Sequence, residues 1–419
     1  MLSTNTRTLA KVLNIDTEHL PKVNFTGVST DTRKSISNTL FVALSGENYD
    51  AHDYIQQAEQ QGAVALIVAK PVNTNLPMLL VKDTQNALAK IACYHLNNIK
   101  PKVIAITGSN GKTTVKNLLK NILSLKAPTL ATKGNLNNHL GVPLTLLELK
   151  PEHQYAVIEM GANHLGEIAY LRDIANPDIA IVTNTGDAHI GEFGGFENLV
   201  KAKGEIYSSS SQNIVNTQTS YQGDLSFGMG GDIFASNIDG NTFTLTIKNK
   251  SIKIQLQLLG RHNIDNALAA SSCAHALGVD IDTIKQGLEV TLAEVGRLEL
   301  IQTGEMRLIN DSYNANPASI KAAINTLGEF TGERVIVLGQ MAELGNDSEQ
   351  LHANIGQIAH ANSDAFYSFG DNTKPYQAQH FGSAQTLAEH LSTYHSQATV
   401  LFKGSRIAKL EQIIAKITV

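Results

Sequence analysis

The stretch Val103-Ile-Ala-Ile-Thr-Gly-Ser-Asn-Gly-Lys-Thr-Thr114 decides the fold of this chain. It joins an apolar run to a turn with two glycines, and apolar residues at helical spacing follow it, namely Val115, Leu118, Leu119 and Ile122. In a strand–turn–helix of this kind, backbone N–H groups and the positive end of the helix dipole face one place, where an anion can bind. The stretch therefore predicts a phosphate loop, with a helix that begins near Thr113.

The loop departs from the common spelling G-x-x-x-x-G-K-[ST], because Ile106 stands at the position of the first glycine. Lys112 can still reach the terminal phosphates of a nucleotide, and the Thr113 hydroxyl can bind Mg²⁺. The alternative is an ordinary strand–turn–helix whose lysine is only solvated. The apolar flanks favour an ATP site built from Gly108, Ser109, Asn110, Gly111, Lys112, Thr113 and Thr114.

Composition narrows the class of protein. The 419 residues are 42% hydrophobic and carry 33 basic and 38 acidic side chains, a formal net charge of −5, which gives no basic surface for nucleic acid. No apolar run is long enough to span a membrane, and residues 1–22 are too polar for a signal peptide. Cys93 and Cys273 lie in apolar stretches without metal-ligand spacing, which favours buried free thiols in a reducing cytoplasm.

Alternating strand and helix patterns form three blocks, 1–98, 99–296 and 297–419, and predict an α/β protein with parallel sheets. Strands are expected at 39–43, 63–68, 78–81, 103–106, 155–159, 179–183, 307–310, 335–338, 365–369 and 399–402. Helices are expected at 51–61, 84–96, 197–207, 318–327, 348–361, 386–395 and 407–417. Alternation within 242–259 predicts a hairpin that breaks at Asn249-Lys250-Ser251.

Candidate metal ligands lie where strands end. Glu159 closes an apolar strand, which favours a Mg²⁺ ligand over a partner for a helix N-terminus. His189 lies in a glycine-containing loop, where a surface position is the commoner interpretation. Lys201 and Lys203 share an amphipathic helix and, from composition alone, would form a solvated face.

Three polar clusters are candidates for ligand binding. Asn135, Asn137 and Asn138 form either a ligand-binding loop or a plain turn. Asp311 can accept ribose hydroxyls, whereas Asn316-Pro317 fits a helix cap equally well. Lys403-Gly-Ser-Arg406 is basic enough for an anion, although Ser405 can simply be an N-cap.

Together these segments resemble the Mur ligases, and among them the dipeptide-adding branch. The resemblance covers nearly the whole chain, and its specificity comes from the order and spacing of the motifs. The motifs are Thr107-Gly-Ser-Asn-Gly-Lys-Thr-Thr114, Gly134-Asn-Leu-Asn-Asn138, Glu159-Met-Gly-Ala-Asn-His164 with Gly166-Glu167, Ala188-His189, Ala202-Lys-Gly-Glu205, Gly260-Arg-His-Asn-Ile-Asp-Asn266, Asn310-Asp-Ser-Tyr-Asn-Ala-Asn316, Val337-Leu-Gly-Gln-Met-Ala-Glu-Leu-Gly345 and Lys403-Gly-Ser-Arg406.

The resemblance implies three α/β domains. Residues 1–98 would bind the UDP-sugar substrate, 99–296 would form the central P-loop-type ATP-binding parallel sheet, and 297–419 would form a Rossmann-like domain for the amino substrate. The implied enzyme is a cytoplasmic ATP-dependent amide ligase that works as a monomer. It would join D-alanyl-D-alanine to UDP-N-acetylmuramoyl-tripeptide through an acyl phosphate.

The resemblance also assigns residue roles. Lys112 would act on the phosphates, and Thr113, Glu159, His189 and a carbamylated Lys203 would hold two Mg²⁺ ions. Asn263 and Asn266 would lie against adenine, Arg297 near the phosphates and Asp311 on the ribose. The implied substrate-binding residues are Ser29, Arg33, Asp50, His52, Asn135, Asn137, Asn138, Tyr313, Asn314, Lys403, Ser405 and Arg406.

One departure and three rivals accompany the resemblance. Gln340 stands where the family more often has aspartate, whereas the carboxylate at Glu343 is retained. Folylpolyglutamate synthetase shares the central machinery, but it lacks a separate UDP-binding block and has its phosphate loop nearer the N-terminus. A Mur ligase that adds the third residue is closer, and the segment 310–316 favours the dipeptide-adding branch. A nucleotide-gated binding protein would not need Glu159, His189 and Lys203 together.

Overall fold

A computed structural model describes residues 1–33, 36–46, 49–186, 193–304, 306–342, 344–394 and 397–418. The chain forms two compact units. The first comprises Met1–Ala105, Lys126–Ala162 and Gly166–Ala180, and the second comprises Ile106–Leu125, Asn163–Leu165 and Ile181–Val419. Among the described helices, none has the length and apolar character needed to cross a membrane.

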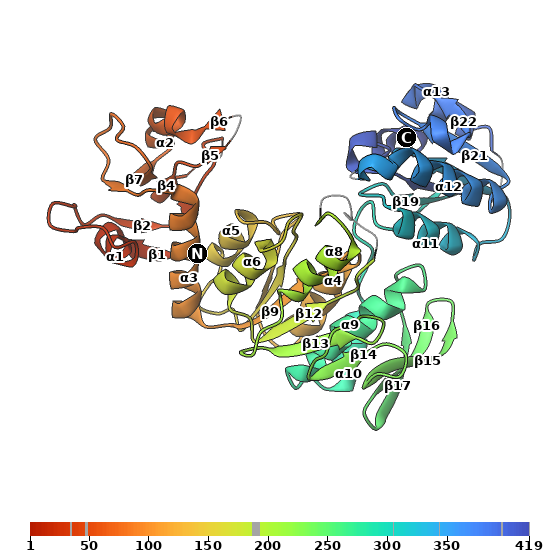
Figure 1. The fold of residues 1–419 in the computed structure, drawn as a ribbon, viewed down its shortest axis with the longest axis horizontal. Helices are drawn as coiled ribbons and strands as arrows, with labels where there is room; N and C mark the ends of the chain where they lie inside the picture. The colour runs from red at the N-terminus through yellow and green to blue at the C-terminus, as the bar shows by residue number, and fades with distance from the viewer. Residues whose placement is uncertain are drawn as a thin grey trace. The chain divides into compact units, whose positions relative to one another are not determined.

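The N-terminal part of the first unit is built on a parallel four-stranded sheet of order β3-β4-β7-β8 (Figure 1). Its strands are β3 (Val28–Ser29), β4 (Thr39–Val42), β7 (Ala63–Val68) and β8 (Met78–Leu80). Around it lie β1 (Ser3–Asn5), α1 (Thr6–Val12), β2 (Asn24–Thr26), β5 (Ser45–Gly46), β6 (Tyr49–Asp50), α2 (Ile55–Gln60) and α3 (Thr84–Ile99). The helix predicted over 51–61 is wrong in its first turn, because Ala51–Tyr54 is a 3₁₀ turn capped by Asp50.

A nine-stranded sheet has the order β10-β11-β9-β12-β13-β14-β15-β16-β17. Its strands are β9 (Lys102–Thr107), β10 (Thr129–Ala131), β11 (Tyr155–Glu159), β12 (Ile179–Val182), β13 (Gln212–Asn216), β14 (Leu225–Phe227), β15 (Ile233–Asp239), β16 (Thr242–Ile247) and β17 (Lys250–Gln255). The helices of this region are α4 (Lys112–Ser124), α5 (Gly141–Leu147), α6 (Glu167–Ala175), α8 (Phe196–Gly204), α9 (His262–Ala276) and α10 (Ile281–Glu289).

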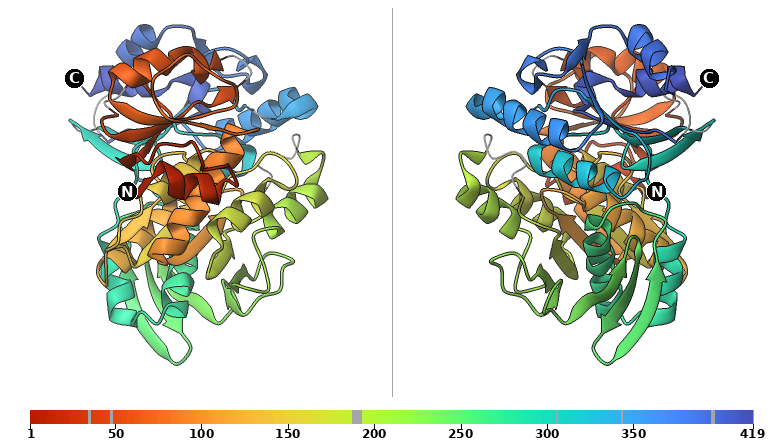
Figure 2. Two further views of the ribbon diagram at one scale, coloured as in Figure 1. Left: turned by 90° about the vertical axis from the view of Figure 1, so that its left-hand side faces the viewer. Right: turned by 90° about the vertical axis from the view of Figure 1, so that its right-hand side faces the viewer.

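The predicted hairpin is confirmed as β16 and β17, which pair antiparallel (green in Figure 2), and β17 packs beside α10. The turn differs from the predicted break by a residue, because β17 already includes Lys250. Lys248 adopts the left-handed conformation, with φ 52°, and reverses the chain before Lys250. Strands β15 to β17 therefore extend a mainly parallel sheet with antiparallel strands.

The C-terminal sheet belongs to the second unit and has the order β18-β19-β23-β20-β21-β22. Its strands are β18 (Glu299–Thr303), β19 (Met306–Asp311), β20 (Arg334–Leu338), β21 (Ala365–Phe369), β22 (Gln379–Phe381) and β23 (Thr399–Lys403). Only β18 pairs antiparallel among the described pairs of this sheet. The predicted Rossmann-like parallel sheet is confirmed, with an antiparallel edge strand added.

Alternating residues of this sheet pack into two cores. Helices α11 (Pro317–Leu327) and α12 (Ser348–Ala361) cover Ile336 and Leu401, and helices α13 (Ala384–Leu391) and α14 (Glu411–Ile417) cover Val335 and Val400. The single helix predicted over 407–417 is wrong at its start. Lys409 is left-handed, with φ 50°, and separates a 3₁₀ turn at Arg406–Ala408 from α14.

Candidate nucleotide and ligase site

The phosphate loop forms between β9 and α4, as the sequence predicts. Ile106 is fully buried in the strand, and the helix begins at Lys112 with Gly111 as its N-cap. A side chain at Gly108 would lie 1.9 Å from Thr183 Oγ1, and one at Gly111 would lie 2.2 Å from Asn266 Oδ1. Both glycines also have positive φ, +150° and +79°. The loop therefore needs glycine at these two positions for the close approach of its backbone to neighbouring groups.

The segment after β12 holds the loop in place. The Ser109 N–H donates to the Asn184 carbonyl at 3.0 Å, and the Ser109 hydroxyl donates to the Gly186 carbonyl at 2.8 Å. Lys112 curls back over the loop, because its Nζ donates to the Gly108 carbonyl at 2.7 Å and to the Ser109 carbonyl at 3.3 Å. The ammonium group thus lies at the mouth of the turn, where a phosphate would take the place of the carbonyl groups as its partner.

Thr113 lies in the first turn of α4 and is 5% exposed. The apolar residues that follow it at helical spacing, from Val115 to Ile122, are fully buried, as predicted. Burial of this face fixes the direction of α4, so its N-terminal N–H groups and its dipole point toward the loop.

Lys203 lies on α8 and is only 2% exposed, whereas Lys201, two residues earlier, is exposed. The expectation that both lysines form a solvated face is therefore wrong for Lys203. Its ammonium lies 5.4 Å from the centre of the Phe193 ring. Burial, and secondarily the like charge of Lys112, lowers the pKa of Lys203 to about 7. A neutral amine is consequently present at neutral pH.

Glu159 ends β11 in the first unit and is 2% exposed. Its backbone N–H donates to Thr132 Oγ1 at 2.9 Å, and its carboxylate accepts from Asn137 Nδ2 at 2.9 Å. Asn138 instead accepts from the Gly141 N–H at 2.9 Å, at the start of α5. The asparagine loop therefore orients Glu159 and starts a helix, while Asn135 lies in the turn that precedes them.

Two residues singled out in the sequence, His189 and Glu343, lie outside the described residues. Within the described ranges, no cluster of three or more His, Cys, Asp or Glu side chains is arranged for a metal ion. The oxygen donors that are described, Thr113 and Glu159, are of the kind that Mg²⁺ prefers.

The two asparagines expected near adenine lie on α9. Asn263 Nδ2 donates to the Leu259 carbonyl at 2.7 Å, and Asn266 Nδ2 donates to Asn263 Oδ1 at 2.8 Å. Because Asn266 also lies against the backbone of Gly111, the pair is placed next to the phosphate loop within the second unit.

Asp311 and Lys403 form a buried ion pair at the ends of the neighbouring strands β19 and β23. Lys403 Nζ lies 2.5 Å from Asp311 Oδ2 and also donates to the Asn314 carbonyl at 2.9 Å. The two side chains are 3% and 14% exposed. Because Lys403 Nζ contacts both residues of this segment, it orients Asp311 and Asn314.

In the rest of the basic segment 403–406, Ser405 is buried and Arg406 is exposed. The Ser405 hydroxyl accepts from the Ala342 N–H at 2.7 Å and makes no cap to the following 3₁₀ turn. Arg406 is largely exposed and lies 3.3 Å from Glu411. Gln340, the departure from the family pattern, accepts from Asn372 Nδ2 at 3.0 Å, so the glutamine makes a local contact within the C-terminal sheet region.

Arg297 stacks on Tyr313, with its guanidinium carbon 4.0 Å from the ring centre. Its Nε lies 3.6 Å from a Glu294 carboxylate oxygen, and the same oxygen accepts from Asn117 Nδ2 of α4 at 3.3 Å. Arg297 and Tyr313 were predicted from the sequence, whereas Glu294 and Asn117 were not. The only signal for Asn117 was a polar residue on the first turns of the phosphate-loop helix.

In the first unit, Asp50 is the centre of a polar network. Its carboxylate lies 2.5 Å from His52 Nδ1 and 2.8 Å from Lys70 Nζ. The hydrogen bond from Lys70 is the largest of several contacts that lower the pKa of Asp50 below its ordinary value. His52 Nε2 accepts from the Ala69 N–H at 2.9 Å, so both ring nitrogens of His52 have protein partners. Lys70 was missed because a lone surface lysine carries no motif.

The other two expected residues of this region lie close together in sequence and in space. The Ser29 hydroxyl accepts from the Asp31 N–H at 3.3 Å, and Arg33 pairs with the same aspartate at 2.9 Å. The Arg33 side chain is 86% exposed, so its guanidinium is open to solvent beside this turn.

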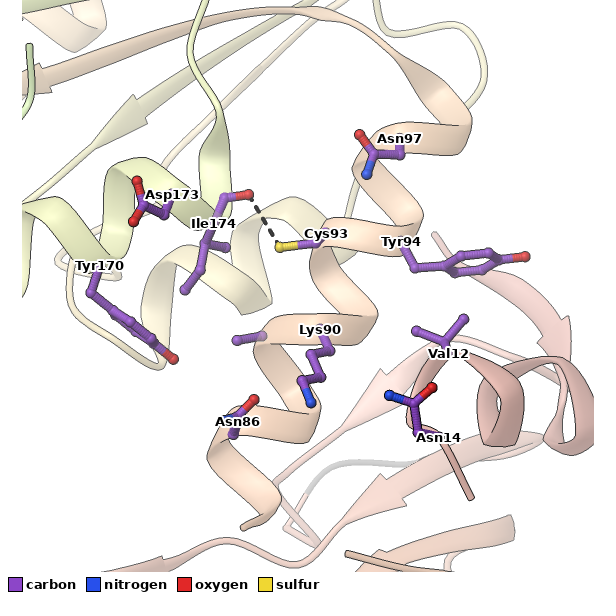
Figure 3. A pocket seen from close by; sticks show the side chains of 11 residues that line it. Val12, Asn14, Asn86, Lys90, Cys93, Tyr94, Asn97, Tyr170, Asp173 and Ile174 are labelled. Atoms are coloured by element: carbon purple, nitrogen blue, oxygen red, sulfur yellow. Dashed lines mark hydrogen bonds between the residues drawn. The ribbon is translucent and has the colours of Figure 1, made fainter. Parts of the chain in front are cut away.

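A pocket of about 510 Å³ lies elsewhere in the first unit, between α1, α3 and α6 (Figure 3). Its walls include Ala89, Cys93, Tyr94 and Ile174, and Cys93 Sγ donates to the Ile174 carbonyl at 3.4 Å. None of the site residues predicted from the sequence lines it. Cys93 is half-buried and Cys273 is buried, so the expectation of two buried thiols is confirmed only for Cys273.

Comparison with known proteins gives matches along the whole chain. Three family models match in succession: the Mur ligase family catalytic domain at residues 24–104, the Mur ligase middle domain at 106–274 and the Mur ligase glutamate ligase domain at 296–416. The UDP-N-acetylmuramoyl-tripeptide–D-alanyl-D-alanine ligase of Escherichia coli (strain K12) is 40% identical over 99% of this chain and 98% of its own length.

Solved structures of MurF ligases also match nearly the whole chain. A crystal structure of MurF from Acinetobacter baumannii has a TM-score of 0.95 and 37% identity, over 100% of this chain and 99% of that one. The MurF ligase from Thermotoga maritima, solved in complex with ADP, has a TM-score of 0.86 and 28% identity, over 94% and 97% of the two chains.

Proposed function

The chain belongs to the Mur ligase family, and on that premise we propose that it joins D-alanyl-D-alanine to UDP-N-acetylmuramoyl-tripeptide at the expense of ATP. The observation that carries this function is the 40% identity, over nearly the full length of both chains, to a ligase of that name. The enzyme is an ATP-dependent peptide ligase of peptidoglycan precursor synthesis. Its products are UDP-N-acetylmuramoyl-pentapeptide, ADP and phosphate.

The reaction requires two displacements. The terminal carboxylate of the tripeptide attacks the γ-phosphorus of ATP, and the bond to the β–γ bridging oxygen breaks to release ADP and leave an acyl phosphate. The amine of D-alanyl-D-alanine then attacks the acyl carbon and loses a proton, and phosphate leaves from the tetrahedral intermediate. Both displacements need a fixed geometry and compensation of phosphate charge. We assign this role to the loop N–H groups and Lys112, and their position at the start of α4 supports it.

Thr113, Glu159, His189 and Lys203 are the ligands that we assign to two Mg²⁺ ions. Thr113 and Glu159 supply a buried hydroxyl and a buried carboxylate, which fit the oxygen preference of Mg²⁺. Bound Mg²⁺ would offset negative charge on the transferring phosphoryl group. The hydrogen bond from Asn137 to Glu159 would hold the carboxylate in one orientation for this role.

An unmodified lysine fits such a set poorly, since its ammonium form has no lone pair and its neutral form offers nitrogen, whereas Mg²⁺ prefers oxygen. The neutral Lys203 amine can add to the carbon of CO₂ and lose a proton, which gives a carbamate anion with two oxygen donors. Its 2% exposure and its pKa of about 7 support this modification, because the neutral amine is the reacting form. Carbamylation would convert a buried cation that is poorly accommodated into an anionic ligand.

The second unit would hold the nucleotide. We assign Gly108, Ser109, Asn110, Gly111, Lys112, Thr113 and Thr114 to the phosphates. Asn263 and Asn266 are assigned to adenine and Asp311 to the ribose. Arg297, oriented by Tyr313 and Glu294, is assigned to the phosphate side. The close packing of Asn266 on Gly111 supports one continuous nucleotide site.

The remaining assignments concern the other two substrates. Ser29, Arg33, Asp50 and His52 would form the UDP-sugar site within the domain 1–98. Within the domain 297–419, Tyr313, Asn314, Lys403, Ser405 and Arg406 would serve the amino substrate. The contacts of Asp50, His52 and Lys403 support a role in shaping these sites. Asn135, Asn137 and Asn138 belong to the central domain 99–296. We further propose a monomer that works in the cytoplasm, where ATP is available.

Phosphate release in the presence of all three substrates, and with each one omitted in turn, tests the function. Release should require ATP, UDP-N-acetylmuramoyl-tripeptide and D-alanyl-D-alanine together, and the pentapeptide product should appear in equal amount. Equal release without the dipeptide would overturn the ligase function and favour a nucleotide-gated binding protein. Parallel reactions with meso-diaminopimelate or lysine as the third residue of the tripeptide would identify the preferred precursor.

A further inference from the structure

A hydrogen bond joins the phosphate loop to the start of helix α11. Asn316 Nδ2 donates to Asn110 Oδ1 at 2.9 Å, across 206 residues of sequence and within the second compact unit. In the domain division predicted from the sequence, Asn110 belongs to the central domain and Asn316 to the C-terminal domain. The bond is therefore a direct link between the phosphate-binding turn and the C-terminal sheet region.

The backbone of Asn110 is already fixed by other groups. Its N–H donates to Asn184 Oδ1 at 3.1 Å, and its carbonyl accepts from Thr183 Oγ1 at 2.6 Å and from Asn184 Nδ2 at 3.0 Å. These contacts hold the turn whether or not Asn316 is engaged. The side-chain contact to Asn316 therefore serves a purpose other than shaping the loop backbone.

The orientation of the Asn316 amide is set by its role as helix cap. Its Oδ1 accepts from the Ser319 N–H at 2.8 Å, and its own N–H donates to the Ser319 hydroxyl at 3.0 Å, which completes a capping box. Because the oxygen must face the helix, the NH₂ group must face away from it. Asn316 is 9% exposed. The cap thus aims a buried donor at Asn110, which has to present its oxygen.

The segment between β19 and α11 is consequently held at both ends. Asp311 at its start pairs with Lys403, and Asn316 at its end bonds the phosphate loop. Asp311 is the residue assigned to the ribose. A ribose ligand and a phosphate ligand would thus be carried on elements whose spacing is set by one hydrogen bond.

We propose that Asn316 is a positioning residue that fixes the segment 311–316 against the phosphate loop, so that the ribose and phosphate contacts of one bound nucleotide are aligned. This proposal rests on the nucleotide site assigned above. Without this hydrogen bond, the ribose contact and the phosphate contacts could each still form, but they would no longer be aligned on one nucleotide. One neutral hydrogen bond of this kind corresponds to a change of about three- to tenfold in nucleotide affinity.

The test is a double-mutant cycle on the binding of Mg·ADP to the full-length protein, measured by titration calorimetry. Asn316→Ser keeps a good N-cap but is too short to reach Asn110, and Asn110→Ala removes the acceptor. We expect Asn316→Ser to weaken ADP binding about three- to tenfold in the wild-type background and less than twofold in the Asn110→Ala background. An equal effect in both backgrounds, or no effect in either, would overturn the proposal.

Ser319→Ala is the matched control, because it removes half of the capping box and leaves the Asn316–Asn110 bond in place. It should lower the thermal unfolding midpoint at least as much as Asn316→Ser does, without changing ADP affinity. In turnover, Asn316→Ser should reduce kcat/KM for ATP and leave KM for UDP-N-acetylmuramoyl-tripeptide unchanged. A wild-type protein that binds ADP but forms no amide would overturn the ligase function and not this link.

Discussion

Lys203 and Lys403 are both 2% exposed, yet they lie in opposite electrostatic surroundings. Lys403 has the carboxylate of Asp311 at 2.5 Å and the carbonyl of Asn314 at 2.9 Å. Lys203 faces the ring of Phe193 and the like charge of Lys112. Burial of a charge is costly unless a counter-charge and hydrogen bonds accompany it.

The difference shows how the partners of a buried lysine, at equal burial, can suit one residue type to two functions. With a carboxylate partner, the ammonium of Lys403 forms an ion pair that positions the segment after β19. Without such compensation, burial lowers the pKa of Lys203 to about 7 and produces an amine that can react. Lys403 is thus suited to hold the site together, and Lys203 is suited to chemistry.

The largest effect is expected from removing the amine of Lys203. Lys203→Ala should reduce ligase activity on the order of 10³-fold or more, because it deletes the group proposed to become a metal ligand. Added bicarbonate should not restore wild-type activity. Lys201→Ala is the matched control on the same helix, and its exposed side chain predicts unchanged turnover. An active Lys203→Ala enzyme would rule out the carbamate role.

Breaking the ion pair between Lys403 and Asp311 should mainly lower the free energy of unfolding. Lys403→Met leaves the Asp311 carboxylate largely buried without its cation, and such losses cost about 3–5 kcal/mol. Urea unfolding should show this decrease, and a double variant that also carries Asp311→Asn should recover part of it. A double variant as unstable as the sum of both single variants would show that the two residues are not coupled.

The Lys70–Asp50 pair is the surface counterpart of the buried Lys403–Asp311 pair. Its N–O distance of 2.8 Å is close to that of the buried pair, but the Lys70 side chain is 57% exposed. Solvent screening limits such pairs to about 0–1 kcal/mol, so Lys70→Met should barely change unfolding. A loss as large as that of Lys403→Met would contradict the dependence on burial.

Local sequence patterns predicted the phosphate loop and most elements of the sheets. Glycine turns, apolar strands and helical spacing act over short distances, so Gly108, Gly111 and the hairpin at 242–255 were accessible from the sequence. Errors occurred where one backbone conformation decides an element, as at Lys409, whose left-handed φ delays the start of the predicted helix. A short-range pattern does not specify such an angle for a lysine.

The electrostatic character of side chains was not predictable in the same way. Lys201 and Lys203 occupy similar helical positions by composition, and only tertiary packing buries one of them. The bonds from Asn316 to Asn110 and from Asn117 to Glu294 join residues far apart in sequence. Such pairs depend on how strands are ordered in the sheets, which no single segment encodes. The resemblance to a family supplied the proposed role of Lys203, and the burial of its side chain supports that proposal.

The pH dependence of stability should also reflect the burial of Lys203. The Lys203 pKa is about 7 in the folded protein and about 10.5 in the unfolded chain. Between these values the unfolded chain holds a proton that folded Lys203 lacks, so the free energy of unfolding of the wild type rises with pH through this window. Below pH 7 the full cost of a charged buried amine remains.

Lys203→Met removes that cost, so the variant should unfold at a higher temperature than the wild type at pH 6, by about 2–4 °C for each kcal/mol recovered. The advantage should shrink between pH 7 and pH 10. Thermal unfolding with EDTA and without CO₂ measures the unmodified amine. Because CO₂ adds only to the neutral amine, bicarbonate should stimulate a decarbamylated wild-type enzyme increasingly as the pH rises through 7. A constant difference in unfolding temperature across the range would show that burial does not shift this lysine, and its proposed reactivity would lose its physical basis.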